Sequence, residues 1–225
     1  MQKKYYLDSL YPLQNEILSI VQSLNNGFYL TGGTALSRFY FNHRFSDDLD
    51  FFINNDANFK DYIKLFAQEF SKKYKSLFEL GLLEDSFSRM SIKGSNCILK
   101  LDFVNDIPIH FGSFNKFPLF NTVDNQINIL SNKISALPRN SAKDIVDIIY
   151  ISQNNIFNWK DIITNAQDKD MWVNPIDAAS IIDTFPFDLF DEIKWIKKPD
   201  YNKLFEHLKI IAKEILLGDD NSLMK

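Results

Sequence analysis

The sequence has very little cysteine, glycine or proline, and it has no long apolar run. The single cysteine, Cys97, excludes an intramolecular disulfide framework and favours a reducing compartment. Seven glycines and seven prolines in 225 residues argue against long irregular loops. No apolar stretch is long enough to cross a membrane, and the first residues lack the apolar core of a signal peptide. We therefore expect a cytoplasmic protein with no membrane partner.

A strongly basic composition is also missing, since the formal net charge is −4. A nucleic-acid partner would therefore have to bind to a local basic patch. The content of 45% hydrophobic and 24% charged residues is typical of a globular protein. The 21 Phe and 9 Tyr indicate an aromatic-rich core, in one large domain or two small ones.

Apolar periodicity predicts strands and helices in the first half of the chain and helices in the second half. Thr34 and Ser141 are placed to cap two of the helices. The expected helices cover residues 12–24 (ending at Asn25-Asn26-Gly27), 34–41, 59–74, 127–137 and 141–153, with helical texture continuing to 217. The expected strands cover residues 28–30, 48–53, 87–93 and 97–104, the last two as a hairpin.

Two features in residues 28–53 point to chemistry. Gly32 and Gly33 follow a short apolar strand, and their missing Cβ atoms allow a tight turn and close approach of a phosphate to backbone N–H groups. Asp48 and Asp50 flank one residue of the next expected strand, so their side chains should point to the same side. Taken alone, each feature also fits an ordinary strand-to-helix turn or a pair of solvated acids.

Further charged residues follow later in the chain. Asp102 lies within an apolar strand, where a carboxylate is exposed, salt-bridged or bound to metal. Lys133 and Asp144 lie on two consecutive expected helices, with Arg139 between them. The alternative interpretation of Lys133 is a solvated helix face, and that of Asp144 is a capping-box position.

Together, a Gly-Gly turn, an Asp-x-Asp strand and a later acidic strand resemble the nucleotidyltransferase superfamily that includes DNA polymerase beta. More closely, three segments in order are similar to the AbiEii-type family of bacterial toxin nucleotidyltransferases: GGTALSRFYFNHRFSDDLDFF, LKLDFV and NKISALPRNSAKDIVDI. The resemblance covers roughly residues 28–151. It implies an α+β fold, with a polymerase-beta-like core (a small mixed sheet with flanking helices) over residues 1–125 and a mainly helical domain over residues 126–225.

The resemblance also implies an enzyme that moves a nucleoside monophosphate from an NTP to an acceptor hydroxyl and releases pyrophosphate. Such a transfer uses carboxylate-bound Mg²⁺, two ions here, to neutralise the developing charge. The implied context is a toxin–antitoxin (abortive infection) pair, with a cognate antitoxin protein and tRNA as the acceptor. The implied metal ligands are Asp48, Asp50 and Asp102, and Asp102 also helps to deprotonate the acceptor. The implied nucleotide contacts are Gly32, Gly33, Thr34, Lys133 and Arg139. Lys133 and Asp144 join the three acids as catalytic residues, and Arg44 is a further phosphate or acceptor contact.

Ser46 lies two residues before Asp48 and would share its side if the strand already begins there. A phosphate on Ser46 would compete with the nucleotide for metal, which suggests a regulatory off-switch. Asp47 adds another acid, and a one-residue slip would turn the acidic pair to the other face. Two alternatives stay open: transfer to a protein or an antibiotic, and a non-catalytic module that binds a nucleotide or a partner.

Overall fold

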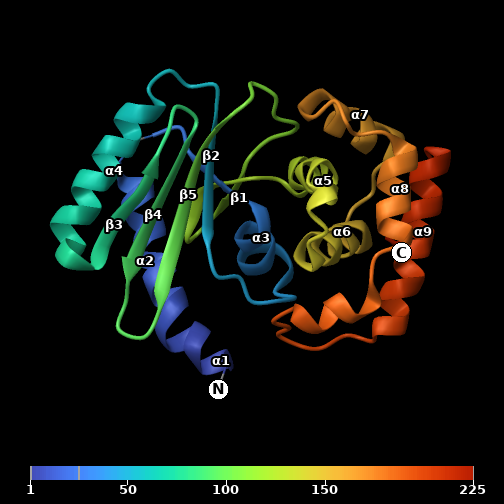
Figure 1. Cartoon of the computed structure of the whole chain (residues 1–225), viewed down its shortest axis with the longest axis horizontal. Coiled ribbons are helices and arrows are strands. Elements are labelled where there is room, and N and C mark those ends of the chain that lie inside the picture. Colours follow the sequence, from blue (N-terminus) through green and yellow to red (C-terminus); the bar gives the residue numbers. More distant parts are fainter. Residues whose placement is uncertain (1, 25, 225) are drawn as a thin grey trace. The chain divides into compact units, whose positions relative to one another are not determined.

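The computed structural model describes residues 2–24 and 26–224, which form two compact units (Figure 1). Unit 1 comprises Met1–Phe39 and Phe45–Asp124, and unit 2 comprises Tyr40–Arg44 and Asn125–Lys225. Part of the helix end expected at residues 25–27, Asn25, lies outside the described residues.

The described part of unit 1 is built on a mixed sheet of seven strands in the order β3-β4-β5-β2-β1-β7-β6. The strands are β1 Tyr29–Thr31, β2 Leu49–Asn54, β3 Phe78–Leu83, β4 Phe87–Lys93, β5 Ile98–Asp106, β6 Asn115–Phe117 and β7 Phe120–Val123. The α-helices are α1 Gln2–Tyr5, α2 Tyr11–Ser23, α3 Gly32–Ala35 and α4 Phe59–Tyr74, with π-helical turns at Tyr6–Leu10 and Leu36–Phe41 and a 3₁₀ turn at Lys75–Leu77.

The central strands of this sheet confirm the expected α+β class and the expected hairpin. β2 pairs antiparallel with β1 and parallel with β5, while β5 pairs antiparallel with β4. The sequence pattern did not predict β3, β6 or β7. β3 and β6 are the edge strands of the sheet, and most of their side chains are exposed. In β3, Phe78, Leu80 and Leu82 alternate with Glu79 and Gly81, so a strand pattern was present there and was not used.

The core of unit 1 lies between α4 and the apolar face of the sheet. On α4 the residues Phe59, Ile63, Phe66 and Phe70 are buried, as the helical periodicity predicted. The ring of Phe66 stacks on Phe103 with 5.1 Å between centroids, and Phe103 also stacks on Phe51 at 5.2 Å. Because side chains alternate along a strand, the residues next to Phe51 on β2 and next to Phe103 on β5 point to the opposite face of the sheet.

The turn between β1 and α3 differs from the expectation. Thr34 does not cap a helix, because the helix already begins at Gly32 and Thr31 is its N-cap. The Thr34 hydroxyl instead hydrogen-bonds the Asp48 carbonyl and the Ser46 hydroxyl. After Ala35 the backbone continues as a π-helical turn rather than as a regular α-helix.

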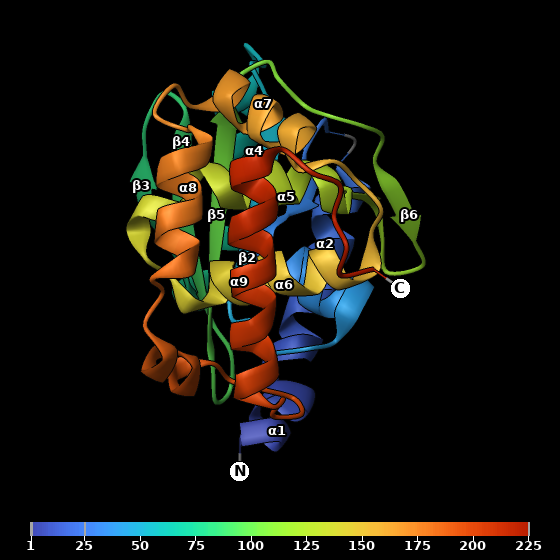
Figure 2. The ribbon, with the colours of Figure 1, turned by 90° about the vertical axis from the view of Figure 1, so that its right-hand side faces the viewer.

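Unit 2 is helical, and α8 and α9 lie side by side in it (Figure 2). The capping-box prediction for its second helix is wrong, because the Ser141 side chain makes no capping hydrogen bond and Asp144 pairs with Lys133. Over residues 2–24 and 26–224, none of the helices has both the length and the apolarity needed to span a bilayer. The elements of unit 2 are α5 Gln126–Ser135, α6 Ala142–Asn154, α7 Trp159–Lys169, α8 Pro175–Asp183 and α9 Tyr201–Leu217, with 3₁₀ turns at Leu137–Arg139 and Phe187–Glu192.

Candidate functional site

The strand register of unit 1 brings the three predicted acids to one face of the sheet. Asp50 on β2 is the direct partner of Asp102 on the parallel strand β5, so both side chains leave the sheet on the same side. Asp48 immediately precedes β2, and its Oδ2 lies 2.9 Å from the Lys100 Nζ. Since Lys100 is two residues before Asp102 on β5, Asp48 belongs to the same face. We call Asp48, Asp50 and Asp102 the acidic face.

The segment leading into β2 distinguishes Asp48 from its neighbour Asp47. The Tyr6 hydroxyl donates a hydrogen bond to the Asp47 carboxylate, and the Tyr6 ring stacks on Phe45 with 4.2 Å between centroids. The Gln14 side-chain amide donates to the main-chain carbonyl of Asp47 at 3.2 Å. Asp47 is therefore held by the N-terminal helical segment, and the one-residue slip that would exchange the two acids does not occur.

Gly32 is required by its backbone and by its contact with Asp50. Its φ angle is +68°, in the left-handed region that residues with a Cβ rarely adopt. A Cβ on Gly32 would lie 3.0 Å from the Asp50 Oδ2. The glycine turn thus brings main chain directly against one carboxylate of the acidic face.

Two cations neutralise part of the acidic face. Arg89 on β4 is the strand partner of Asp102, and its Nε and Nη2 donate to the two carboxylate oxygens at 2.7 and 2.8 Å. This fork satisfies Asp102, which is only 9% exposed and would be costly to bury alone. The hydrogen bond to Asp102 raises the pKa of Arg89. Lys100 forms an ion pair with Asp48 in the same way, through a single contact.

The acidic face fits Mg²⁺ by its donor chemistry but is engaged with these cations. Carboxylate oxygens are the hard ligands that Mg²⁺ prefers, and three of them share one face. Yet among residues 2–24 and 26–224, no three His, Cys, Asp or Glu side chains converge closely enough to hold a metal ion as they stand. A metal on this face would therefore meet Arg89 and Lys100 on two of its ligands.

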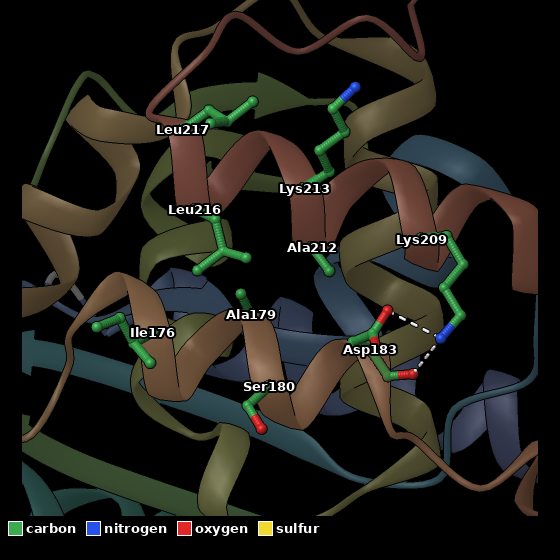
Figure 3. A pocket seen from close by; sticks show the side chains of 9 residues that line it. All are labelled: Ile176, Ala179, Ser180, Asp183, Lys209, Ala212, Lys213, Leu216 and Leu217. Atoms are coloured by element: carbon green, nitrogen blue, oxygen red, sulfur yellow. Dashed lines mark hydrogen bonds and ion pairs between the residues drawn. The ribbon is translucent and has the colours of Figure 1, made fainter.

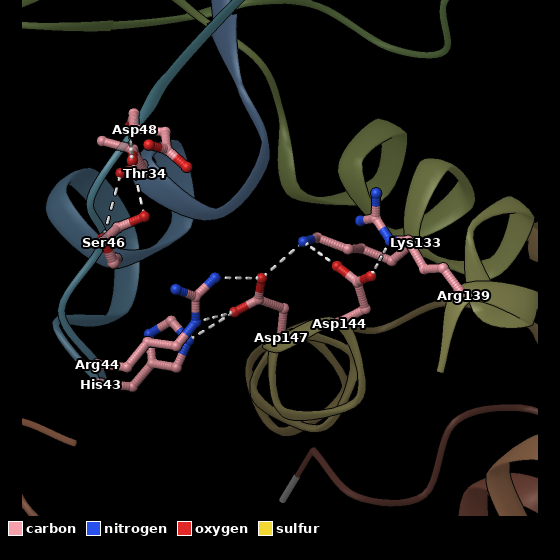
Figure 4. A network of polar contacts seen from close by, with 10 residues as sticks. Thr34, His43, Arg44, Ser46, Asp48, Lys133, Arg139, Asp144 and Asp147 are labelled. Atoms are coloured by element: carbon pink, nitrogen blue, oxygen red, sulfur yellow. Dashed lines mark hydrogen bonds and ion pairs between the residues drawn. The ribbon is translucent and has the colours of Figure 1, made fainter. Parts of the chain in front are cut away.

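Unit 2 joins the other predicted residues in a buried ionic cluster (Figure 4). The Lys133 Nζ lies 2.5 Å from Asp144 Oδ1 and 2.8 Å from Asp147 Oδ2, and Arg139 donates from Nε to Asp144 Oδ2. Lys133 is 6% exposed, so the alternative of a solvated helix face is wrong. Burial lowers the pKa of Lys133, but the charges of Asp147 and Asp144 raise it by more, so Lys133 stays protonated.

Asp147 is the central residue of this cluster, and the sequence reasoning missed it. Its carboxylate accepts two hydrogen bonds from Arg44, at 2.8 and 2.7 Å, and also contacts His43 at 2.9 Å. Burial raises the pKa of Asp147, but the charges of Arg44 and Lys133 bring it well below its ordinary range. The available signal was its spacing, since residues three apart share a helix face and Asp144 is three residues earlier.

His43 and Arg44 belong to the interior of unit 2. Arg44 was expected to contact a phosphate or an acceptor, but it is 2% exposed and donates a two-bond fork to Asp147. The Nδ1 of His43 has no hydrogen-bond partner among the described residues. Burial lowers the pKa of His43 more than its bond to Asp147 raises it, so the ring is neutral at pH 7.

Unit 2 also has an apolar groove of about 500 Å³ between α8 and α9 (Figure 3). Ile176, Ala179, Ala212 and Leu216 form much of its surface, with a Lys209–Asp183 ion pair at one side. None of the predicted site residues lies there.

Comparisons with known proteins identify the family and the fold. The family described as "Nucleotidyl transferase AbiEii toxin, Type IV TA system" matches residues 17–212. The fold is similar to that of JHP933 from Helicobacter pylori, with a TM-score of 0.58, 19% identity and 92% of each chain covered. A nucleotidyltransferase toxin from Mycobacterium tuberculosis H37Rv, MenT4, gives a TM-score of 0.62 and 14% identity, with 92% of this chain and 82% of that chain covered. No curated protein matched the sequence.

Proposed function

The chain belongs to the AbiEii family of nucleotidyl transferase toxins, and from this premise we propose that it transfers a nucleoside monophosphate from an NTP to an acceptor hydroxyl. We propose tRNA as the acceptor, Mg²⁺ as the cofactor, the cytoplasm as the location and a cognate antitoxin protein as the partner. One observation carries the proposal: Asp50 on β2 and Asp102 on β5 are direct strand partners, and Asp48 lies immediately before β2. We further propose that residues 1–125 are the catalytic core and residues 126–225 a helical domain.

In the proposed reaction the acceptor oxygen forms a bond to the α-phosphorus of the NTP. The bond from that phosphorus to the oxygen bridging to the β-phosphate breaks, and pyrophosphate leaves. Two Mg²⁺ ions bound to Asp48, Asp50 and Asp102 would supply the positive charge that phosphoryl transfer needs. Asp102 is the group that we propose to take the proton of the acceptor hydroxyl.

For the triphosphate we propose backbone contacts from Gly32, Gly33 and Thr34. The first N–H groups of a helix have no partner within the helix, and glycines let a phosphate approach them. The Thr34 hydroxyl already hydrogen-bonds the Asp48 carbonyl, so the donor that Thr34 offers is its main-chain N–H.

Unit 2 supplies the cationic residues of the proposal. We propose that Lys133 and Arg139 contact the nucleotide and that Asp144 orients both of them. The support is the pair of contacts that Asp144 makes, from one oxygen to Lys133 and from the other to Arg139. The Arg139 side chain is 60% exposed and can therefore reach a ligand, while Asp144 fixes its position.

A labelling experiment tests the function. The protein is incubated with each α-³²P-labelled NTP, Mg²⁺ and total tRNA, and the labelled product is identified. We expect labelled tRNA with wild-type protein and a loss of at least about a hundredfold with Asp50→Asn, because removal of a group that stabilises the transition state costs that much. The matched control is Asp106→Asn, an acid on the same strand as Asp102 whose carboxylate binds a neighbouring main-chain N–H.

The same experiment separates the alternatives. Label on a protein or on an added antibiotic, with tRNA unlabelled, would support the second acceptor class. If no acceptor takes up label in Mg²⁺, and if Asp50→Asn leaves the toxic effect in cells unchanged, the chain is a module that binds without turnover.

We also propose that Ser46 is a regulatory site. Ser46 is 8% exposed, and its hydroxyl hydrogen-bonds Thr34 at 2.8 Å, beside the main chain of Asp48. A phosphate there would break this contact and add negative charge next to the acidic face. We expect Ser46→Glu to abolish transfer, whereas Ser71→Glu on the exposed side of α4 should not. Full activity of Ser46→Glu would contradict the proposal.

A further inference from the structure

The carboxylates of the acidic face are already bound by cations of the same sheet. Arg89 uses both oxygens of Asp102, and Lys100 holds Asp48 by one oxygen. The strand register places both cations beside these acids. Arg89 faces Asp102 across the β4–β5 ladder, and Lys100 is two residues before Asp102 on the same strand. They are therefore fixed neighbours of the site, on the side of the sheet where a nucleotide and its metal would bind.

A metal and these cations bind the same carboxylate oxygens. Each carboxylate oxygen offers about two acceptor positions, and the guanidinium fork takes one on each oxygen of Asp102. The three acids with Arg89 and Lys100 carry a net charge of −1, and a divalent ion added with both cations in place would make it +1. Like charges a few ångströms apart repel each other, so metal binding opposes both ion pairs.

Both cations are able to leave. The Arg89 side chain is 48% exposed and the Lys100 side chain 37% exposed, so each reaches water without unfolding the sheet. Water also screens their attraction to the carboxylates, which limits the stability of each pair. The exchange of a cation for a metal ion is thus a local side-chain movement.

We propose that Arg89 and Lys100 are built-in counter-ions that compete with the divalent cation for Asp102 and Asp48, and so set the metal affinity of the enzyme before nucleotide binds. The inference rests on the proposed function, because it assumes that the acidic face is the metal site. It explains why the acids do not form a ready metal site although they share one face. It assigns a function to two residues outside the predicted catalytic set.

The test measures Mn²⁺ binding without nucleotide, by the electron paramagnetic resonance signal of the free ion. We expect Arg89→Met to tighten binding on the order of tenfold, since it removes a forked charge-assisted pair. We expect Lys100→Met to tighten binding about threefold, in line with an exposed ion pair. Adding Asp50→Asn to the Arg89→Met variant should remove most of the gain, which places the ion on the acidic face.

The control for net charge is Lys93→Met, which removes a cation from the same strand as Arg89 but at its far end. Its Mn²⁺ affinity should stay within about twofold of wild type, because screening over such a distance is strong. Circular dichroism spectra of all variants establish that they are folded.

Three outcomes overturn the inference. If Arg89→Met and Lys100→Met bind Mn²⁺ no more tightly than Lys93→Met while wild-type protein transfers label, the competition does not exist but the proposed function stands. If Arg89→Met binds the ion more weakly, Arg89 is a positioning residue that orients Asp102 and not a competitor. If neither wild-type protein nor any variant binds Mn²⁺ or transfers label, the proposed function fails together with the inference.

Discussion

Replacing Asp147 by Asn should destabilise unit 2 by about 3–5 kcal/mol, because it leaves buried cations without their carboxylate. Asp147 is fully buried and accepts two hydrogen bonds from Arg44 and a contact from Lys133 at 2.8 Å. Asn keeps the shape but loses the charge, and its NH₂ group turns a donor toward these donors. Lys133 still has Asp144, so most of the cost arises at Arg44, whose side chain is 2% exposed.

Urea unfolding followed by tryptophan fluorescence measures this effect within unit 2. All three tryptophans of the chain, Trp159, Trp172 and Trp195, lie in that unit. The matched control is Asp183→Asn, whose partner Lys209 is half exposed, and it should cost less than about 1 kcal/mol. The double variant Arg44→Met with Asp147→Leu should recover part of the loss, because it removes both charges. If Asp147→Asn unfolds at the same urea concentration as Asp183→Asn, the reasoning is wrong.

Two other predictions concern backbone strain and pH. Gly32→Ala should destabilise unit 1 by about 1–3 kcal/mol in thermal unfolding followed by circular dichroism, because of its positive φ and the close Asp50 carboxylate. The control is Gly81→Ala, where the added Cβ would lie 3.5 Å from the Arg89 carbonyl oxygen, and it should cost less than about 1 kcal/mol. Equal losses of stability in the two variants would contradict the prediction. Because burial lowers the pKa of His43 below 6.5, the unfolded chain takes up this proton first, so the stability of unit 2 should fall as pH drops below 6.5. His43→Gln should flatten that decline. If the urea midpoint measured by tryptophan fluorescence falls by the same amount from pH 7.5 to pH 5.5 in both proteins, the assignment to His43 is contradicted.

The local elements of the fold were predictable because their signals are local. The α4 helix begins and ends where its apolar periodicity does, and the β4–β5 hairpin follows alternation on both sides of a turn. The edge strand β3 was missed although Phe78, Leu80 and Leu82 alternate along it, because the run is short and directly follows the α4 helix. The helix expected over residues 34–41 is present but begins two residues earlier, at Gly32, and continues after Ala35 as a π-helical turn to Phe41.

The buried ionic cluster of unit 2 shows a different limit of prediction from sequence. Lys133 and Asp144 were singled out by resemblance, but the solvated and capping interpretations considered for them were wrong because both residues are buried against each other. Asp147 was overlooked, although it binds Arg44 and Lys133 together. A helix pattern shows which residues share a face, but not which charged groups from distant segments that face will meet.

The sequence by itself determined the pieces of this protein: a glycine turn, acids one residue apart, and a later acid in an apolar strand. Periodicity decides such features because neighbouring side chains alternate by chain geometry alone. Only the tertiary structure decided that Asp50 lies beside Asp102 and that Arg89 faces the same carboxylate. Those pairings depend on which strands lie next to each other, and strand order is a property of the whole sheet rather than of any local pattern.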